Sequence, residues 1–577
     1  MKTKELFLQV NGSRKDVEVH LPDGRVIKGP RGSQVGDFLR VVPEWLNPPI
    51  MGAVIDGDLR ELTYPIHKDA TVKPVTMADS DGSKIYRRSL TLLLETAFED
   101  LFPNRDLTID YSVPSGGFFC RVLEKTQLSK IEIKQLMVRM RKLVSEDIPL
   151  IRTQVSKEEA IDYFTAKNKL DKVRLLKYRQ KPYLVLYSLK NHRDYHHGYM
   201  VPSTGFLKWF DLLWQGEGFI LQYPRRKTPT DLHKMPEYSK LIGIFEQYGE
   251  WLNNLGINSV GSLNEAIENG SVPEIILVSE AQQEQKISQI AIKIKEKSED
   301  MKVILIAGPS SSGKTTFSKR LAIQLLSMGI SPFALEMDNY FIDRERTPKD
   351  ENGHYDFEAF EAIDTILLQQ QLRQLVSGDE VHLPHYNFQT GKREKGEIIR
   401  LKKGQIVIIE GIHGLNPDLL PDFSVSSTFR IYVSCLTQLN LDRYNRISTT
   451  DTRMLRRIVR DAHERGFSAQ RTIQMWESVR RGERQHIFPF QENADEIFNS
   501  ALVYELSALK PFAESLLRLI PHGSAEYLEA KRLLATLEWF LPIDEKLVPD
   551  NSILREFIGG SILTDFRLWG NASEKYS

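Results

Sequence analysis

The spacing of apolar positions changes several times along this 577-residue chain. From residue 6 to about residue 74, apolar and polar residues alternate in short stretches such as VEVHL and GAVID, separated by turns rich in Gly and Asp. A period of two predicts β-strands, and turns such as PDG and IDGD are typical of hairpins. We therefore predict a small β-rich domain over residues 1–75.

A helical period begins at about residue 80. Leu90, Leu93, Leu94 and Phe98 recur at spacings of three and four, which places them on one face of a helix. Mixed helix and strand patterns continue to about residue 225, and a polar, largely helical stretch follows. These changes predict an α+β domain over residues 76–225 and a helical connector over residues 226–290.

The remainder, residues 291–577, alternates apolar strands such as VILIA and IVIIE with amphipathic helices. This alternation predicts a parallel sheet with flanking helices. From about residue 500 the chain is helical and apolar on one face, and this part is expected to complete the core of the region or to form an oligomer contact. The predicted fold class is multidomain, α/β and α+β.

Composition and charge narrow the classes of function. The 77 basic and 77 acidic side chains cancel, so no global field attracts nucleic acid or anionic lipid. The two cysteines, Cys120 and Cys435, are too few for a disulfide framework or a thiolate zinc site. We find no signal-peptide pattern and no apolar run near the roughly 20 residues that span a bilayer. A cytoplasmic protein without a membrane partner is predicted.

A phosphate-binding loop follows the strand VILIA. Residues 308–315, GPSSSGKT, match the pattern GxxxxGK[ST], and a strand precedes and a helix follows them. Lys314 is expected to reach the β- and γ-phosphates of ATP, and the Thr315 hydroxyl to hold Mg²⁺. The predicted ATP-binding residues are Gly308, Pro309, Ser310, Ser311, Ser312, Gly313, Lys314, Thr315 and Thr316.

Acidic residues follow two later strands. Asp338 comes directly after FALEM, where a carboxylate beside the phosphate loop can accept the proton of an acceptor hydroxyl; a turn or helix cap is the alternative. Glu410 ends IVIIE and suits Mg²⁺ or its bound waters. These positions favour a kinase over other proteins with the same loop.

An arginine-rich stretch comes later, in DTRMLRRIVRDAHERG. Its arginines recur at helical spacing, which is typical either of a solvated helix face or, beside a phosphate site, of a lid that closes over the transferring phosphoryl group. These arginines are Arg453, Arg456, Arg457, Arg460 and Arg465.

Together these motifs resemble the uridine kinase and phosphoribulokinase family over roughly residues 300–500. The similar stretches are GPSSSGKTT, MDNYF, HYDFEAFEAID, LPHYNF, EGI and DTRMLRRIVRDAHERG. The resemblance implies a P-loop kinase that uses ATP and Mg²⁺ in nucleoside salvage. It implies transfer of the γ-phosphate to a nucleoside 5′-hydroxyl, with uridine or cytidine as acceptor.

The resemblance also implies roles for individual residues. Catalysis is assigned to Asp338 as base and to Lys314, Arg457, Arg460 and Arg465 as stabilisers of the transferring charge. Acceptor binding is assigned to Asp356, Tyr386 and Phe388, and Mg²⁺ binding, partly through water, to Thr315 and Glu410.

Four positions depart from the family pattern and keep the acceptor open. Gly391 replaces a base-contacting His and Asn387 an Asp, while Phe467 and Met475 replace an Arg and a Gln. A kinase for another sugar or a small alcohol is therefore an alternative. A second alternative is a nucleotide-gated RNA-binding regulator, in which ATP binding switches the N-terminal half.

The N-terminal half has a resemblance of its own. Residues 1–75 resemble a TGS domain, and residues 76–225 are similar to the second domain of threonyl-tRNA synthetase, most clearly in DGSKIYRRSLTLLLETAFEDLFP. At that enzyme's four editing positions this chain has Arg88, Leu92, His196 and Met200, so editing is not expected. His196 and His197 remain as a structural pair or as remnant ligands. The resemblance leaves these domains to contact RNA, a nucleotide or another protein, or to pack on the kinase.

Overall fold

The computed structural model of the chain describes residues 14–42, 47–123, 126–236, 238–350 and 353–566, so the strand expected from residue 6 begins outside them. The first region is a five-stranded mixed sheet in the order β2-β1-β5-β3-β4, in which only β1 and β5 pair in parallel. Its elements are β1 (Asp16–His20), β2 (Val26–Pro30), α1 (Val35–Leu39), β3 (Ile50–Ile55), β4 (Asp58–Arg60) and β5 (Ala70–Thr76).

The second region packs two antiparallel sheets, β11-β12-β7-β6 and β10-β9-β8, around the long helix α2 (Ser80–Leu101). Leu90, Leu93, Leu94 and Phe98 are all buried, which confirms the predicted helix face. The other elements are β6 (Leu107–Val113), β7 (Gly117–Val122), α3 (Lys130–Ser145), β8 (Ile151–Ser156), α4 (Lys157–Ala166), α5 (Leu170–Lys177), β9 (Tyr183–Leu189), β10 (His192–Tyr195), β11 (Asp211–Gln215) and β12 (Gly218–Gln222).

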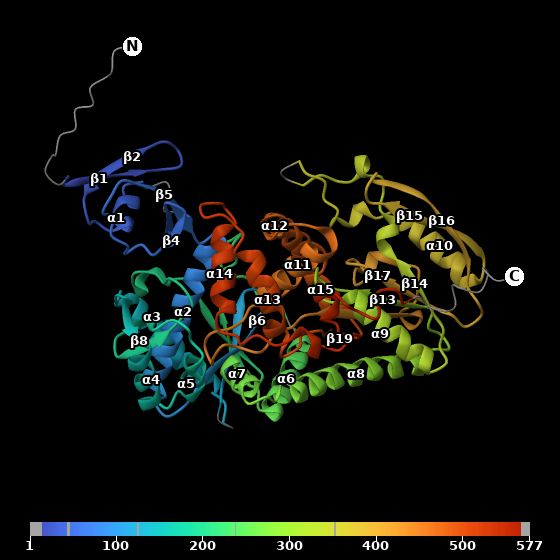
Figure 1. Cartoon of the computed structure of the whole chain (residues 1–577), viewed down its shortest axis with the longest axis horizontal. Coiled ribbons are helices and arrows are strands. Elements are labelled where there is room, and N and C mark those ends of the chain that lie inside the picture. Colours follow the sequence, from blue (N-terminus) through green and yellow to red (C-terminus); the bar gives the residue numbers. More distant parts are fainter. Residues whose placement is uncertain (1–13, 43–46, 124–125, 237, 351–352, 567–577) are drawn as a thin grey trace, which may run out of the picture.

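The stretch expected as a helical connector, residues 226–290, holds α6 (Ser239–Leu255), α7 (Val260–Glu268) and most of α8 (Val272–Glu296), which continues past residue 290. Helix α8 runs along one edge of the molecule and reaches the C-terminal region (Figure 1). There its residues Ile287, Ile290 and Ile294 join the same hydrophobic core as the parallel sheet.

The C-terminal region is built on a five-stranded parallel sheet in the order β14-β17-β13-β18-β19, as the strand and helix pattern predicts. β13 is buried at every residue, and burying each Val, Ile or Leu stabilises the fold by about 1.5–3 kcal/mol. The elements are β13 (Val303–Ala307), α9 (Lys314–Ser327), β14 (Pro332–Glu336), α10 (Thr365–Ser377), β15 (Glu380–Asn387), β16 (Lys392–Arg400), β17 (Ile406–Glu410), β18 (Thr428–Ser434), α11 (Thr449–Arg465), α12 (Ala469–His486), β19 (Glu496–Asn499), α13 (Glu505–Leu517), α14 (Tyr527–Leu537) and α15 (Arg555–Ile558).

The C-terminal helices belong to the core that surrounds the sheet. Leu509 of α13, Leu533 of α14 and Phe557 of α15 are buried in the same cluster as β13 and α9. Of the two expectations for this part of the chain, completing the core is therefore the one that its packing supports.

One loop of the C-terminal region inserts into the second region. This inserted segment, residues 436–448, lies between β18 and α11. The carbonyl oxygen of Arg443 accepts the backbone N–H of Ile109 at 2.8 Å, and the Arg443 guanidinium pairs with Asp171 at 2.9 Å. Buried Asp442 pairs with Lys172 of α5 at 3.1 Å. The two regions therefore share a polar, buried interface.

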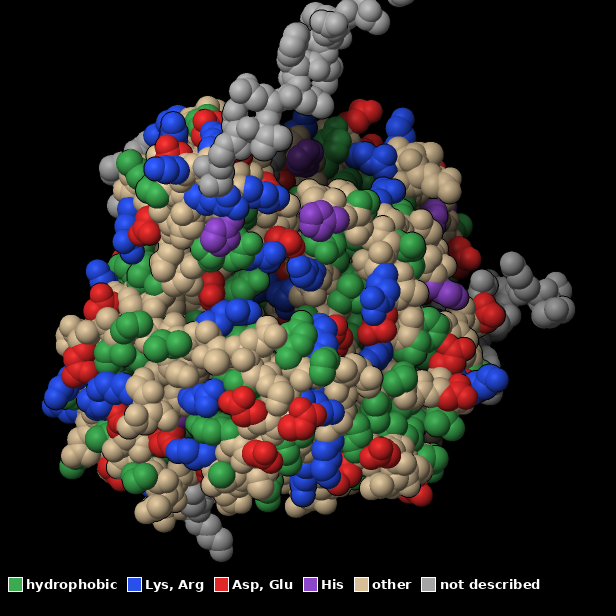
Figure 2. Space-filling view, turned by 60° about the vertical axis from the view of Figure 1, so that its left-hand side comes forward, with side chains coloured by type: hydrophobic (Ala, Val, Ile, Leu, Met, Phe, Trp, Pro, Cys, Tyr) green, Lys and Arg blue, Asp and Glu red, His purple; other side chains and the backbone are tan. Residues whose placement is uncertain are grey.

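The first two regions and the parallel sheet lie at opposite ends of the long axis, with α11, α13 and α14 between them (Figure 1). Within the described ranges, no helix has the length and apolar character needed to cross a membrane. On the face shown in Figure 2, Lys and Arg side chains are interspersed with Asp and Glu rather than gathered into one basic patch.

Candidate active site

The loop between β13 and α9 is shaped to hold anions. Helix α9 begins at Lys314, and Gly313 precedes it in the left-handed conformation at φ +85°. A Cβ at Gly308 would lie 2.0 Å from the carbonyl oxygen of Val433, so no side chain fits there. The N–H groups of the first helical turn have no partner inside the helix, and the helix dipole adds to their attraction for phosphate.

Thr315 and Glu410 lie together at the edge of the sheet. β13 and β17 are neighbours, so Glu410 at the end of β17 comes beside the start of α9. The Thr315 hydroxyl donates to Glu410 Oε1 at 2.8 Å. Burial raises the pKa of Glu410 to about 7, although Lys314 and the Thr315 hydroxyl lower it. A hydroxyl and a carboxylate side by side fit the oxygen ligands that Mg²⁺ prefers.

Asp338 follows β14 in a short 3₁₀ turn, Met337–Tyr340, at the same edge of the sheet. Its side chain is open to solvent on one side, while the surrounding protein desolvates the carboxylate enough to raise its pKa. Lys314 and Arg465 act on this carboxylate in the opposite direction and lower the pKa. Asp338 therefore lies within electrostatic range of both the phosphate loop and α11.

Helix α11 places three of its arginines on one carboxylate. Asp461 is fully buried and pairs with Arg457 at 3.2 Å, Arg460 at 3.5 Å and Arg465 at 3.3 Å. Arg457 also donates to the Ser310 hydroxyl at 2.7 Å, which joins the helix to the phosphate loop. Three guanidinium groups sharing one acid leave positive charge for an anionic ligand.

The other two arginines of α11 are structural. Arg453 is buried, pairs with Glu483 and donates to the Ser310 carbonyl oxygen at 2.8 Å. Arg456 is buried, pairs with Glu505 and donates to the Ser500 carbonyl oxygen at 2.9 Å. The interpretation of α11 as a solvated face is therefore wrong, because Glu483 and Glu505 supply buried partners that the local sequence does not show.

The three residues expected to bind the acceptor do not form one connected group. The rings of Tyr386 and Phe388 are 5.1 Å apart, and the Phe388 side chain is exposed. Asp356 Oδ1 accepts the backbone N–H of Glu358 at 3.1 Å, so one of its oxygens stabilises a turn. The contacts bring Tyr386 and Phe388 together but show no hydrogen bond that joins Asp356 to them among the described residues.

Two positions that depart from the family pattern have local explanations. A Cβ at Gly391 would lie 2.7 Å from the Arg344 guanidinium carbon, so Arg344 fills the space where a larger residue would need room. Asn387 Oδ1 accepts the N–H groups of Gln389 and Thr390 and so stabilises the turn between β15 and β16.

Sequence reasoning missed two acidic residues beside the loop. Glu358 is half-buried, its pKa is raised to about 7 by burial and by Glu483, and Arg457 and Lys314 lower it. No hydrogen bond of its carboxylate is found in the described part of the chain. Glu483 accepts the backbone N–H of Ser310 at 3.1 Å. Glu358 lies in the stretch that resembles the family motif, but Glu483 carried no sequence signal.

A third missed residue comes from the C-terminal end. Thr316 donates its backbone N–H to Glu556 Oε2 at 3.1 Å and its hydroxyl to the same oxygen at 2.8 Å. Glu556 belongs to α15, for which the sequence predicted no chemistry. Because helix N-terminal N–H groups bind phosphate, this carboxylate and a nucleotide phosphate would compete for the same donors.

The parallel sheet, the loop after β13 and the arginines of α11 define a P-loop domain of the kinase type. Residues 303–507 match the sequence model of the Phosphoribulokinase / Uridine kinase family. The similarity to that family covers these residues of the C-terminal region.

The other similarity concerns the N-terminal region. A threonine–tRNA ligase of Burkholderia lata is 30% identical over 240 residues, which cover 39% of this chain and 38% of that protein. The corresponding ligase of Clostridium kluyveri is 31% identical over 198 residues, covering 34% and 31%. The chain thus spans well under half the length of these relatives.

Among solved structures, a possible uridine kinase from Bacillus stearothermophilus is 21% identical and covers 36% of this chain and all of its own, with a TM-score of 0.24. D-glycerate 3-kinase from Cryptococcus neoformans is 13% identical and covers 36% of this chain and 90% of its own, with a TM-score of 0.27.

Proposed function

We propose that this protein is an ATP-dependent kinase that transfers the γ-phosphate to the 5′-hydroxyl of a nucleoside, with uridine or cytidine as the leading acceptor. One observation carries the proposal: Asp338 lies within electrostatic range of both Lys314 of the phosphate loop and Arg465 of α11. A carboxylate between the groups that hold a triphosphate suits a base for an alcohol. An ATPase that only positions water has no need of it.

In this proposal each group acts on a different part of the reaction. The loop N–H groups and Lys314 hold the phosphates of ATP. Asp338 accepts the proton of the acceptor hydroxyl as the hydroxyl oxygen attacks the γ-phosphorus, the bond between the γ-phosphorus and the bridging oxygen breaks, and ADP leaves. The charge on the phosphoryl oxygens is neutralised by Arg457, Arg460 and Arg465. These three guanidinium groups share one carboxylate, Asp461, so part of their positive charge is available to the phosphoryl group.

Thr315 and Glu410 are the residues that would hold Mg²⁺. Their oxygens already lie within hydrogen-bond distance, and the pKa of Glu410 is raised chiefly by burial, with a smaller contribution from Glu556 and Asp338. Bound there, Mg²⁺ would neutralise charge on the β- and γ-phosphates. All the proton chemistry of the proposal remains with Asp338.

The acceptor site in this proposal comprises Asp356, Tyr386 and Phe388, and it includes Glu358. Aromatic rings at 386 and 388 favour an acceptor with a flat apolar part. The Glu358 carboxylate, which makes no hydrogen bond within the described residues, favours one with hydroxyl donors over an anion. The proposal also divides the chain into four domains, residues 1–75, 76–225, 226–290 and 291–577. The first two domains then contact RNA or another protein, or serve the kinase by packing on it.

The test is ATP consumption by the purified full chain with a panel of nucleosides, sugars and small alcohols, and with RNA. One nucleoside should raise turnover well above the rate without acceptor and yield its monophosphate. Asp338→Asn should lower that stimulated rate by about 10²–10⁴-fold. Asp379→Asn changes an exposed aspartate away from the loop and should leave the rate unchanged.

Two results would contradict the proposal in different ways. Stimulation by a sugar or small alcohol alone would keep the kinase and replace the acceptor. Stimulation by RNA alone, with Asp338→Asn as active as the native chain, would favour the nucleotide-gated regulator.

A further inference from the structure

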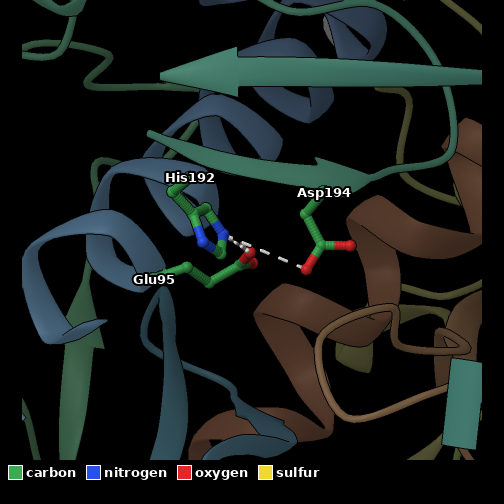
Figure 3. Close-up of side chains that lie close together, drawn as sticks. All are labelled: Glu95, His192 and Asp194. Carbon is green, nitrogen blue, oxygen red and sulfur yellow. Dashed lines mark hydrogen bonds and ion pairs between the residues drawn. The ribbon is translucent and has the colours of Figure 1, made fainter. Parts of the chain in front are cut away.

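A second cluster of ionisable side chains lies inside the second region, remote from the phosphate loop in sequence. Glu95 projects from α2, and His192 and Asp194 project from alternate positions of β10, so that all three point toward one another (Figure 3). All three side chains are buried. Because they come from a helix and a strand rather than from loops, their positions are fixed by the fold.

The facing atoms have spacings suited to a metal ion. Glu95 Oε2 lies 3.1 Å from His192 Nε2, which lies 4.0 Å from Asp194 Oδ2, and all three atoms are within 4.8 Å of one another. Ligand atoms around a cation with bonds of about 2.0–2.2 Å are roughly 3.0–3.6 Å apart, so small side-chain rotations suffice.

The remaining polar atom of each of these three side chains already has a neighbour. His192 Nδ1 bonds to Glu99, and Asp194 Oδ1 pairs with Lys172 at 2.8 Å. Glu95 Oε1 lies 3.4 Å from His196 Nε2. In known metal sites the ligating imidazole donates its other N–H to a carboxylate, and ligating carboxylates are held in turn by outer partners. Here that outer set leaves Oε2, Nε2 and Oδ2 facing inward.

Two further observations point to a missing cation. With His192 neutral, as a metal ligand must be, the buried carboxylates Glu95, Asp194 and Asp442 have one ammonium among them, Lys172, which pairs with Asp194 and Asp442, so two negative charges of this group are unbalanced. His196 is 3% exposed, and although its Nε2 lies 3.4 Å from Glu95 Oε1, neither atom makes a hydrogen bond of acceptable geometry among the described residues. Buried polar atoms without partners mark places where an unobserved group binds.

We propose that Glu95, His192 and Asp194 bind one divalent transition-metal cation inside the second region, and that this ion stabilises the junction with the inserted segment. One imidazole and two carboxylates suit Zn²⁺, Mn²⁺ or Fe²⁺ and leave a position for water or for His196. The ion neutralises the two unbalanced charges. Through Lys172, which pairs with both Asp194 and Asp442, the site reaches the segment that precedes α11.

A competing arrangement has no metal. Burial lowers the pKa of His192, but hydrogen bonds to Glu95 and Glu99 outweigh that effect and raise the pKa to about 9. A protonated His192 would then balance one of the same carboxylates. The experiment must therefore separate a metal ion from a proton.

The experiment uses the full chain stripped with a chelator and returned to metal-free buffer. Zn²⁺ is added, with Mn²⁺ in parallel, and bound metal is counted by mass spectrometry after desalting, alongside thermal unfolding. We expect about one ion per chain and a Tm several degrees higher than that of the stripped protein, because a structural metal adds its binding free energy to folding.

Three variants distinguish this site from adventitious binding. His192→Gln and Glu95→Gln should lose the ion and the metal-dependent rise in Tm. Glu99→Gln removes only an outer partner, so it should keep about one ion while losing roughly 10–100-fold in affinity. No bound metal in the native chain, or equal binding by the native chain and both ligand variants, would overturn the proposal; because the first result needs no variant, a variant that fails to fold leaves the test intact.

Discussion

The lid helix α11 and the buried cluster of the second region both hold more charge of one sign than of the other. On α11, three arginines share the single carboxylate of Asp461, and Arg465 is 46% exposed. In the buried cluster, Asp194 and Asp442 share Lys172, whose side chain is 2% exposed, and Glu95 lies beside them against His192. The arginines of α11 have surplus positive charge that reaches solvent at Arg465, and the buried cluster has surplus negative charge that is closed to solvent.

The difference teaches what each region is suited to bind. A surplus of arginine at an accessible surface suits an anion that arrives and leaves, such as the phosphates of a nucleotide. A surplus of carboxylate in the interior suits a cation that stays, because nothing can exchange without opening the fold. The sign of the surplus charge, taken together with its exposure to solvent, thus distinguishes a site where ligands turn over from a site that stabilises the fold.

Removing the Lys172 ammonium from the buried cluster is the change expected to have the largest effect. Lys172→Met leaves Asp194 and Asp442 buried without their ammonium partner and should lower the free energy of unfolding by about 3–5 kcal/mol in urea. Lys181→Met breaks an exposed pair with Glu538 and should cost less than about 1 kcal/mol. Equal losses in the two variants would mean that burial does not distinguish these pairs.

The same comparison predicts the opposite outcome for α11. Arg457→Ala removes a surplus cation beside Ser310 and should lower kcat by about 10²–10³-fold, with little loss of stability. Arg373→Ala, which breaks an exposed pair with Asp422, serves as the control. If the Arg457→Ala variant instead has a much lower Tm than the native chain and an unchanged kcat, then Arg457 stabilises the fold, as Arg453 does.

A change of pH tests whether Glu410, at the edge of the parallel sheet, binds Mg²⁺. Glu410 must be ionised to hold Mg²⁺, and its pKa is raised to about 7, so affinity for Mg·ATP should fall by up to about tenfold per unit as pH drops below 7. The stability of the ligand-free chain should change in the opposite direction. Since the folded state holds this proton more tightly than the unfolded chain, stability is gained as pH falls through 7.

Calorimetric titration of Mg·ATP and thermal unfolding at pH 6 and pH 8 measure the two effects. Glu410→Gln removes the titrating group, so the difference between native and variant isolates it. Identical pH dependence in both proteins would show that Glu410 is not the group involved.

The smallest expected effect concerns Glu556, an acid whose carboxylate would compete with phosphate for the N–H group of Thr316. Glu556→Gln keeps the shape of the side chain but removes its charge beside Thr316, and should lower KM for ATP by roughly two- to fivefold. Glu545→Gln, in the same C-terminal part, should leave KM unchanged. A raised KM in Glu556→Gln would mean that the carboxylate supports the loop rather than competing with the nucleotide.

The sequence was most informative where structure is local. The phosphate loop could be predicted because strand, loop and helix are contiguous, and because Gly308 and Gly313 meet backbone requirements that only glycine satisfies. Asp338 and Glu410 could be predicted because carboxyl ends of parallel strands meet at one edge of a sheet.

Residues that depend on distant partners could not be found in this way. Glu556 contacts Thr316 only because α15 folds back on α9. Arg456 can be buried because it pairs with Glu505, which lies 49 positions later in the sequence. The buried cluster did leave a trace. Glu95 interrupts the apolar face of α2, and His192 and Asp194 alternate with a period of two, but no local rule brings that helix and that strand together.

The inserted segment has a consequence for how such a chain can evolve. Its backbone is hydrogen-bonded to Ile109 and its side chains to Asp171 and Lys172, and α11 begins directly after it. Cutting the chain between the second region and the connector would leave buried donors and acceptors of both pieces without partners. The second region and the C-terminal region have separate relatives, but they can no longer be exchanged independently. Replacing either region by a homologous one would require the inserted segment and the residues that contact it to be replaced together.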